Sequence, residues 1–170
     1  MRYIFLTINL FIFGVIYPQL SLNSPPKSLL NSLDQNIPII EMPLIDIDEI
    51  LNMDEPAQFG YSFSVDFDFF EHANMIVLDN GDKIFRLILY SPEAYSINLV
   101  FDNFFLSDGT ELFIYNMDYS HTIGAFTSQN NKSFNRFSTS PVSGEKIIIE
   151  YYEPGHVTRN SIINVSNIIH

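Results

Sequence analysis

Short runs of alternating apolar and polar residues recur along this chain and constrain its fold more than any other feature. Residues 59–66 alternate strictly, with apolar side chains at Phe59, Tyr61, Phe63 and Val65. Successive side chains of a strand point to opposite faces of a sheet, so this spacing predicts a half-buried strand. The same period returns from Tyr95 to Asp102, which predicts a second strand.

Turn dipeptides separate these runs. Asn80-Gly81 lies between the apolar runs 74–79 and 83–90, and it predicts a β-hairpin closed by a two-residue turn. Asp108-Gly109 and Ser143-Gly144 are further turn signals. Other candidate strands are 111–115, 121–126, 136–138, 145–152 and 161–169. Eight or nine short strands at about ten-residue spacing predict an all-β, antiparallel sandwich of the jelly-roll or immunoglobulin-like kind.

Composition agrees with a sheet protein that depends on its hydrophobic core. The chain has sixteen Phe and nine Tyr, residue types that favour strands. It has no cysteine, which excludes disulfides, thiolate metal sites and a thiol nucleophile. One short amphipathic helix is expected at 43–51, with Asp46 as its cap and Glu49 three residues later. We expect one domain, residues 43–170.

The first residues are typical of an export signal. Arg2 provides a positive charge, and Ile4 to Tyr17 is almost continuously apolar, a length that suits a signal peptide better than a membrane span. Residues 1–21 are therefore interpreted as a signal peptide and 22–42, rich in Ser, Asn and Pro, as a linker. This predicts a secreted or periplasmic protein that leaves the membrane once the signal is removed; a retained membrane anchor is the alternative.

The charge of the chain disfavours two classes of partner. Eight Lys and Arg against twenty Asp and Glu give a formal net charge of −12, which repels nucleic acids and anionic lipids. Twelve of the acidic residues lie between Asp34 and Asp82. Two groups there have oxygen ligands that could suit calcium: Asp66, Asp68 and Glu71, and Asp79 with Asp82. Neither group matches a known calcium loop. A solvated acidic face is the alternative explanation for these carboxylates, so we assign no metal or cofactor ligand.

No catalytic constellation is apparent in the sequence. A serine peptidase needs a nucleophilic serine on a glycine-flanked turn, together with a histidine and an acid, and neither G-x-S-x-G nor G-D-S-G-G occurs. Ser143-Gly144 is the nearest approach, and a hairpin turn explains it better. The four histidines are scattered without zinc-site spacing: His72, His121, His156 and His170. We therefore expect that the chain is not an enzyme, and we assign no catalytic residue.

Aromatic residues have two interpretations. The alternating ones favour burial in the core, although a carbohydrate-stacking platform is the other possibility. The residues concerned are Phe59, Tyr61, Phe63, Phe101, Phe104, Phe105, Phe113, Tyr151 and Tyr152.

An ordered series of segments carries a resemblance to a known family: 59–61, 78–87, 91–101, 109–116, 123–127, 130–132, 141–145 and 149–154. Together they resemble the N-terminal, non-catalytic region of secreted bacterial trypsin-like serine peptidases of the lysyl endopeptidase kind. The resemblance covers about residues 43–170. In that family a strand ending much like 165–170 leads into the peptidase domain, whose catalytic residues have no counterpart in this part of the sequence.

The resemblance implies a function without catalysis. The chain is expected to accompany a serine endopeptidase domain, in cis or in trans, as a propeptide or as an accessory module that assists folding or inhibits activity. A stand-alone extracellular β-sandwich that binds carbohydrate or protein is one alternative. A truncated peptidase fragment without activity is the other.

Overall fold

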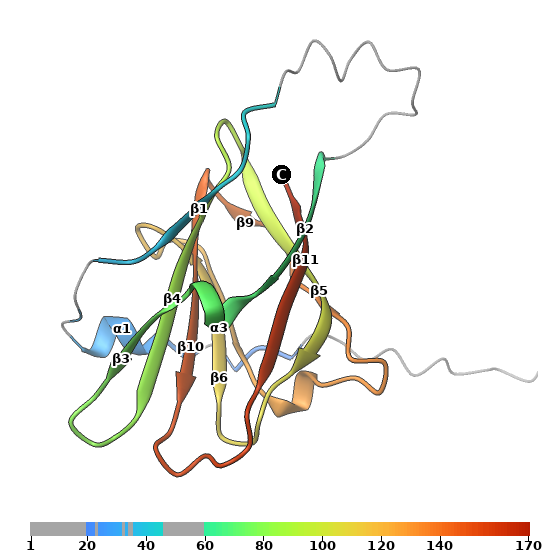
Figure 1. Cartoon of the computed structure of the whole chain (residues 1–170). Coiled ribbons are helices and arrows are strands. Elements are labelled where there is room, and N and C mark those ends of the chain that lie inside the picture. Colours follow the sequence, from blue (N-terminus) through green and yellow to red (C-terminus); the bar gives the residue numbers. More distant parts are fainter. Residues whose placement is uncertain (1–19, 23, 32, 34–35, 46–59) are drawn as a thin grey trace, which may run out of the picture.

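The computed structural model describes residues 20–22, 24–31, 33, 36–45 and 60–170. Two β-sheets pack face to face and enclose one main core (Figure 1). The predicted all-β sandwich is therefore confirmed. The helix predicted at 43–51 falls largely on 46–59, outside the described residues, so that prediction stays open.

The first sheet has six strands. They are β1 (Ile39–Glu41), β3 (Asn74–Val77), β4 (Lys83–Tyr90), β6 (Glu111–Asn116), β7 (Thr122–Phe126) and β10 (Lys146–Glu153). Its order is β1-β4-β10-β6-β7, and β3 pairs with the other half of β4. All pairs are antiparallel except β1 with β4, which run parallel. This one parallel pair departs from the antiparallel arrangement expected.

The second sheet has five strands. They are β2 (Ser62–Asp68), β5 (Ser96–Phe105), β8 (Phe137–Ser138), β9 (Val142–Ser143) and β11 (Ile162–Ile169). Its order is β2-β11-β5-β8, and β9 pairs with the beginning of β5. The short helix α3 (Phe69–His72) carries the chain from β2 to β3 in the other sheet. Asp68 caps this helix by accepting a hydrogen bond from Phe70 N at 2.7 Å.

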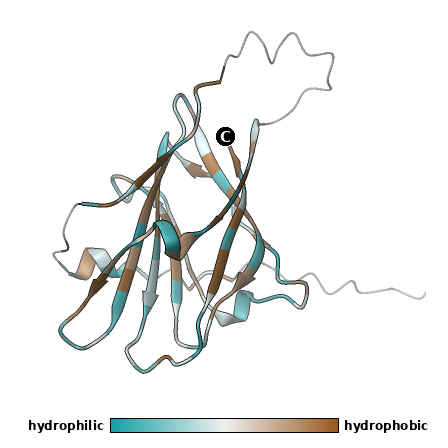
Figure 2. Cartoon of the chain, viewed as in Figure 1, coloured by the Kyte–Doolittle hydropathy of each residue, from teal (hydrophilic) through white to brown (hydrophobic). Residues whose placement is uncertain are grey.

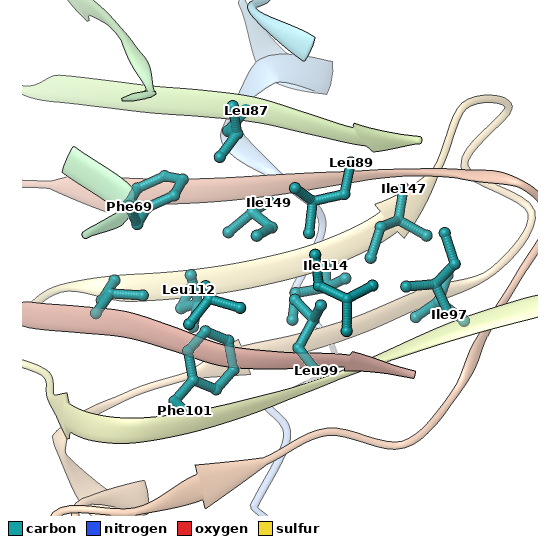
Figure 3. Packing of buried hydrophobic residues seen from close by; sticks show 14 of the residues in the cluster. Phe69, Leu87, Leu89, Ile97, Leu99, Phe101, Leu112, Ile114, Ile147 and Ile149 are labelled. Carbon is teal, nitrogen blue, oxygen red and sulfur yellow. The ribbon is translucent and has the colours of Figure 1, made fainter. Parts of the chain in front are cut away.

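The core lies between the two sheets because each long strand turns its apolar period inward. Leu87 and Leu89 of β4 belong to the same core cluster as Leu99 and Phe101 of β5, and all four are fully buried. Figure 3 shows these side chains with their neighbours from β6, β10 and α3. Each such side chain contributes about 1.5–3 kcal/mol when it leaves water. This burial replaces the disulfides that the chain lacks.

The predicted hairpin forms, but its turn is longer than expected. β3 and β4 pair from Asn74 with Arg86 to Val77 with Lys83. Leu78 N donates to Asp82 O and Gly81 N donates to Leu78 O, so three residues, 79–81, form the loop. Gly81 has φ +85°, which suits a hairpin with an extra residue at this position. Figure 2 shows the loop as hydrophilic, at the end of hydrophobic strands.

The strand predicted from Tyr95 begins one residue later. Tyr95 is 97% exposed and precedes β5, whereas Ile97, Leu99 and Phe101 point into the core as predicted. The preceding residues turn sharply, with Glu93 at φ +63°, and Gly144 N donates to Tyr95 O. The side chain of Tyr95 therefore does not belong to the apolar period that its spacing suggested.

The segment interpreted as a linker is part of the fold, so that interpretation is wrong. The described residues between 20 and 42, here called the N-terminal strap, contain the helical turn α1 (Lys27–Leu30) and the strand β1. The strap crosses the outer face of the first sheet strand by strand. Leu22 N donates to Ala125 O of β7, Lys27 forms an ion pair of 2.8 Å with Glu111 of β6, and Ser28 contacts β10. β1 then lies beside β4 (Figure 1).

Candidate functional site

The fold brings two serine–histidine pairs together. Ser91 Oγ lies 2.6 Å from His170 Nδ1, which joins the end of β4 to the end of β11. Ser143 Oγ lies 3.2 Å from His121 Nδ1, which joins β9 to the start of β7. The partners are 79 and 22 residues apart in sequence, so no local motif indicated either pair.

Neither pair has the arrangement of a catalytic triad. Ser91 is fully buried, and burial lowers the pKa of His170. His121 Nδ1 also accepts a hydrogen bond from the backbone N of Ser143, which uses the lone pair that a general base would need. In the described part of the chain, no hydrogen bond joins a carboxylate to either imidazole ring. Each of the two hydrogen-bonded pairs holds a loop against a strand. The sequence likewise indicates a structural role for Ser143, as part of a turn.

Three of the five acidic residues considered for calcium form hydrogen bonds within the protein, whereas Glu71 and Asp79 are exposed. Asp66 Oδ1 accepts a hydrogen bond from Asn164 Nδ2 at 2.9 Å, and Asp68 caps α3. Asp82 accepts hydrogen bonds from the Tyr152 hydroxyl and from Gly155 N. Among the residues that the structure describes, no group of three or more His, Asp or Glu side chains is close enough to hold a metal ion.

The contact between Asp82 and Tyr152 fixes the β3–β4 hairpin against the end of β10. The hydroxyl of Tyr152 lies 2.6 Å from Asp82 Oδ2. This hydrogen bond, followed by that of Gly155 N, lowers the pKa of Asp82. Burial, and then the hydrogen bond to Asp82, raise the pKa of Tyr152 to about 12. Asp82 therefore has a structural role here.

Most of the aromatic residues considered as a carbohydrate platform are in the core. Phe101, Phe104, Phe113 and Tyr151 are fully buried or nearly so. Tyr61 is 38% exposed and packs edge-on against Phe63, which is partly buried. Phe59 lies outside the described residues. These four aromatic residues are therefore core residues, as the alternation predicted. Tyr61 and the half-buried Phe105 and Tyr152 remain accessible at the surface.

A polar cluster lies buried beneath the N-terminal strap. Glu150 of β10 is fully buried on the outer face of the first sheet. One of its carboxylate oxygens accepts a hydrogen bond from the Tyr115 hydroxyl at 2.6 Å, and the other accepts one from Ser28 N at 3.1 Å. Burial, and then the charge of Glu150, raise the pKa of Tyr115. Arg86 lies directly opposite Glu150 in the strand register and is also buried.

The strap also covers apolar side chains on this face. Ile88, Phe113, Tyr115, Ala125 and Ile148 form a second hydrophobic cluster. Ile37 of the strap packs against it. No local sequence pattern indicates this cover, because Ser28 and Glu150 are 122 residues apart. The strap and its buried carboxylate are therefore a structural element of the domain.

An open hollow of about 520 Å³ lies where three loops meet at one end of the sandwich. The loops are the turn after β5, the 3-10 turn η1 (Ser128–Asn130) with Asn131, and the loop between β10 and β11. These loops gather at the lower end of the molecule in Figure 1. The lining residues are Phe105, Ser107, Asp108, Ser128, Asn131, His156, Val157, Thr158 and Arg159.

Hydrogen bonds between the loops fix the shape of this hollow, here called the loop-end hollow. Ser107 Oγ donates to Arg159 O at 2.6 Å, and Ser107 N donates to Ser161 Oγ. The side-chain amide of Asn131 bonds both the N and the O of Leu106 at 2.8 Å. The walls are thus held by long-range contacts and exist without a ligand.

Arg159 is the main cationic group of the hollow. The centre of its guanidinium lies 3.9 Å from the centre of the Phe105 ring, so the cation lies over the aromatic ring in a cation–π contact. Within the described residues, no carboxylate lies within 4.0 Å of this guanidinium, whereas Lys27 and Lys83 each have a carboxylate partner. The edges of the guanidinium, which carry its N–H donors, therefore remain available to a ligand.

Comparison of the chain with protein-family models, with curated proteins and with solved structures gives no match. No helix among the described residues is long and apolar enough to cross a membrane.

Proposed function

We propose that this chain is a non-catalytic β-sandwich domain that accompanies a secreted serine endopeptidase, as a propeptide or as an accessory module that assists folding or inhibits activity. The proposal includes export of the chain by a signal peptide. Its partner is a trypsin-like peptidase domain, either joined to the chain or separate from it.

One observation carries the proposal: the segments on which the family resemblance rests fold together as one unit. Residues 78–87 contain the β3–β4 loop and much of β4, 91–101 contain most of β5, and 109–116 form β6 with its turn. Residues 123–127 contain most of β7, and 149–154 the second half of β10. These strands share the main core. The segments of the resemblance thus belong to strands of one core, as expected for a resemblance between modules.

The serine and histidine residues of the domain support a role without catalysis. Ser91 is fully buried, and Ser143, at the end of β9, donates its backbone N–H to the imidazole Nδ1 of His121. Proteolysis in this proposal belongs to the partner alone.

The domain acts through a preformed surface. A rigid sandwich that binds the native peptidase, and not its unfolded form, stabilises the native peptidase by mass action. At a domain concentration of 100 times the dissociation constant, this stabilisation is about 2.7 kcal/mol. If the same surface covers the substrate cleft, binding also inhibits the peptidase.

The test uses the purified chain, from residue 20 onward, and a separately purified trypsin-like peptidase domain of the lysyl endopeptidase kind. We expect the chain to raise the refolding yield of the denatured peptidase or to inhibit the folded peptidase, in proportion to added chain. A heat-denatured sample of the chain is the control. An unchanged refolding yield together with unchanged peptidase activity would refute the proposal, as would peptide hydrolysis by the chain alone.

A further inference from the structure

We propose that the loop-end hollow binds a carboxylate of a peptide chain, with Arg159 as the group that recognises it. This inference deepens the proposed function, because it names the surface and the chemistry by which the domain would hold a protein partner. Two sources can supply the carboxylate: an Asp or Glu side chain, or the C-terminus of a peptide.

The charge of the hollow carries the first step. The protein has eight Lys and Arg against twenty Asp and Glu, so exposed cationic groups are few on its surface. Arg159 is exposed and has no carboxylate partner within the described residues, while His156 lines the same hollow. A guanidinium with no carboxylate within 4.0 Å among the described residues favours an anionic ligand over a neutral one.

The geometry of Arg159 carries the second step. The Phe105 ring holds the guanidinium from one side, and Ser107 Oγ holds the backbone of Arg159 by its hydrogen bond to Arg159 O. A planar fork that is already oriented matches the two oxygens of a carboxylate, and it loses less conformational entropy on binding than a free side chain.

The other groups of the hollow favour a peptide as the carrier of this carboxylate. Asp108 supplies an acceptor for a backbone N–H, and Ser128 and Thr158 supply hydroxyl groups. An apolar side chain lies beside the hollow: Ile162 is 40% exposed and pairs with Phe105 in the register. Ile162 and the ring of Phe105 fit the side chains of a peptide better than the hydroxyl groups of an acidic saccharide.

Calorimetric titration of the chain from residue 20 onward tests the inference with three unlabelled, N-acetylated hexapeptides. The first contains one internal glutamate and has an amidated C-terminus. The second replaces that glutamate with glutamine and keeps the amide, so that it has no carboxylate. The third also contains glutamine but has a free C-terminal carboxylate. Trigalacturonate, an acidic saccharide, is the fourth ligand.

We expect the first or the third peptide to bind, and the second to bind at least about 10-fold more weakly, because a charge-assisted hydrogen bond contributes about that much affinity or more. Binding of the first peptide identifies a side-chain carboxylate, and binding of the third identifies a chain terminus. Equal affinity of all three peptides, or no binding by any, would overturn the inference. Binding of trigalacturonate alone would also overturn it.

Substitutions at Arg159 separate a specific site from general attraction of charge. Arg159→Gln is expected to weaken binding of the carboxylate peptide about 10-fold to 100-fold, and Arg159→Lys, which keeps the charge but not the fork, by an intermediate factor. Lys146→Gln is the matched control, because it removes one positive charge at the opposite end of β10, where Lys146 lies over Tyr90. Circular dichroism verifies that each variant is folded. Equal losses for Arg159→Gln and Lys146→Gln would contradict the inference.

The outcome is distinguishable from that of the proposed function. If the chain inhibits or refolds the peptidase equally well with Arg159→Gln, the hollow is not the docking surface and the proposed function stands. If the carboxylate peptides bind through Arg159 while the peptidase is unaffected by the chain, the site stands and the proposed partner does not.

Discussion

Removal of one hydroxyl group tests whether the N-terminal strap is a structural part of the domain. Tyr115→Phe deletes the donor that lies 2.6 Å from Glu150 Oε2 and 3.0 Å from Ser28 Oγ. Glu150 is fully buried, so water cannot replace the lost donor without opening the strap. A hydrogen bond to a charged group contributes about 1.5–3 kcal/mol, and we expect the free energy of unfolding to fall by this amount. At about 2–4 °C per kcal/mol for a domain of this size, the melting temperature falls by about 3–12 °C.

The assay is urea and thermal unfolding at pH 7, followed by far-ultraviolet circular dichroism. Tyr119→Phe is the matched control, because the Tyr119 ring stacks on Tyr115 at 4.7 Å while none of the hydrogen bonds of the buried cluster involves the Tyr119 hydroxyl. The control is expected to change stability by less than about 0.5 kcal/mol. Equal unfolding midpoints for the two variants would refute the role assigned to the buried cluster.

Three further predictions concern pH and backbone geometry. The fold raises the pKa values of Tyr151 and Tyr152 to about 12. The contribution of these two tyrosines to the free energy of unfolding is therefore fully present below pH 10 and is lost as the pH rises toward 12. Urea midpoints and tyrosinate absorbance measured across this pH range check the prediction. Burial lowers the pKa of His170, so its contribution to the free energy of unfolding is present above pH 6.5 and is lost as the pH falls below that value. His170→Gln is therefore expected to make the free energy of unfolding depend less on pH in this range. Gly124 has φ +109°, and a Cβ at this position would lie 2.5 Å from Leu112 O. Gly124→Ala is therefore expected to lower the free energy of unfolding by about 1–3 kcal/mol. Gly144→Ala, at φ +106° but in open space, is expected to lower the free energy of unfolding by less.

The strands of the sandwich could be predicted from sequence because their burial follows a local period. Ile97, Leu99 and Phe101 alternate with polar residues, and the structure places all three in the core. Tyr95 has the same spacing but lies before the strand, where the turn at Glu93 directs it into solvent. A period of two locates a strand well and its first residue poorly, since the turn decides where the strand begins.

The strap and the loop-end hollow could not be predicted because both depend on contacts between distant residues. Residues 22–36 are rich in Ser, Asn and Pro, a composition that fits a linker as well as a segment lying across a sheet. The contact of Ser28 with Glu150 produces no periodic pattern in the sequence. Phe105 is the last residue of β5 and Arg159 lies in the loop before β11, 54 residues later, so the pairing of β5 with β11 is what brings them into contact. The lack of a catalytic motif could be read from the sequence, but the two serine–histidine pairs required the fold.

Calorimetric titration of the chain from residue 20 onward into a folded trypsin-like peptidase domain tests the central claim most directly. We predict saturable binding of one chain per peptidase, with a dissociation constant that increases at least about 10-fold with Arg159→Gln and stays the same with Lys146→Gln. Absence of heat at micromolar concentrations of both proteins, with no effect on the refolding of the peptidase, would contradict a role for this domain beside a serine endopeptidase.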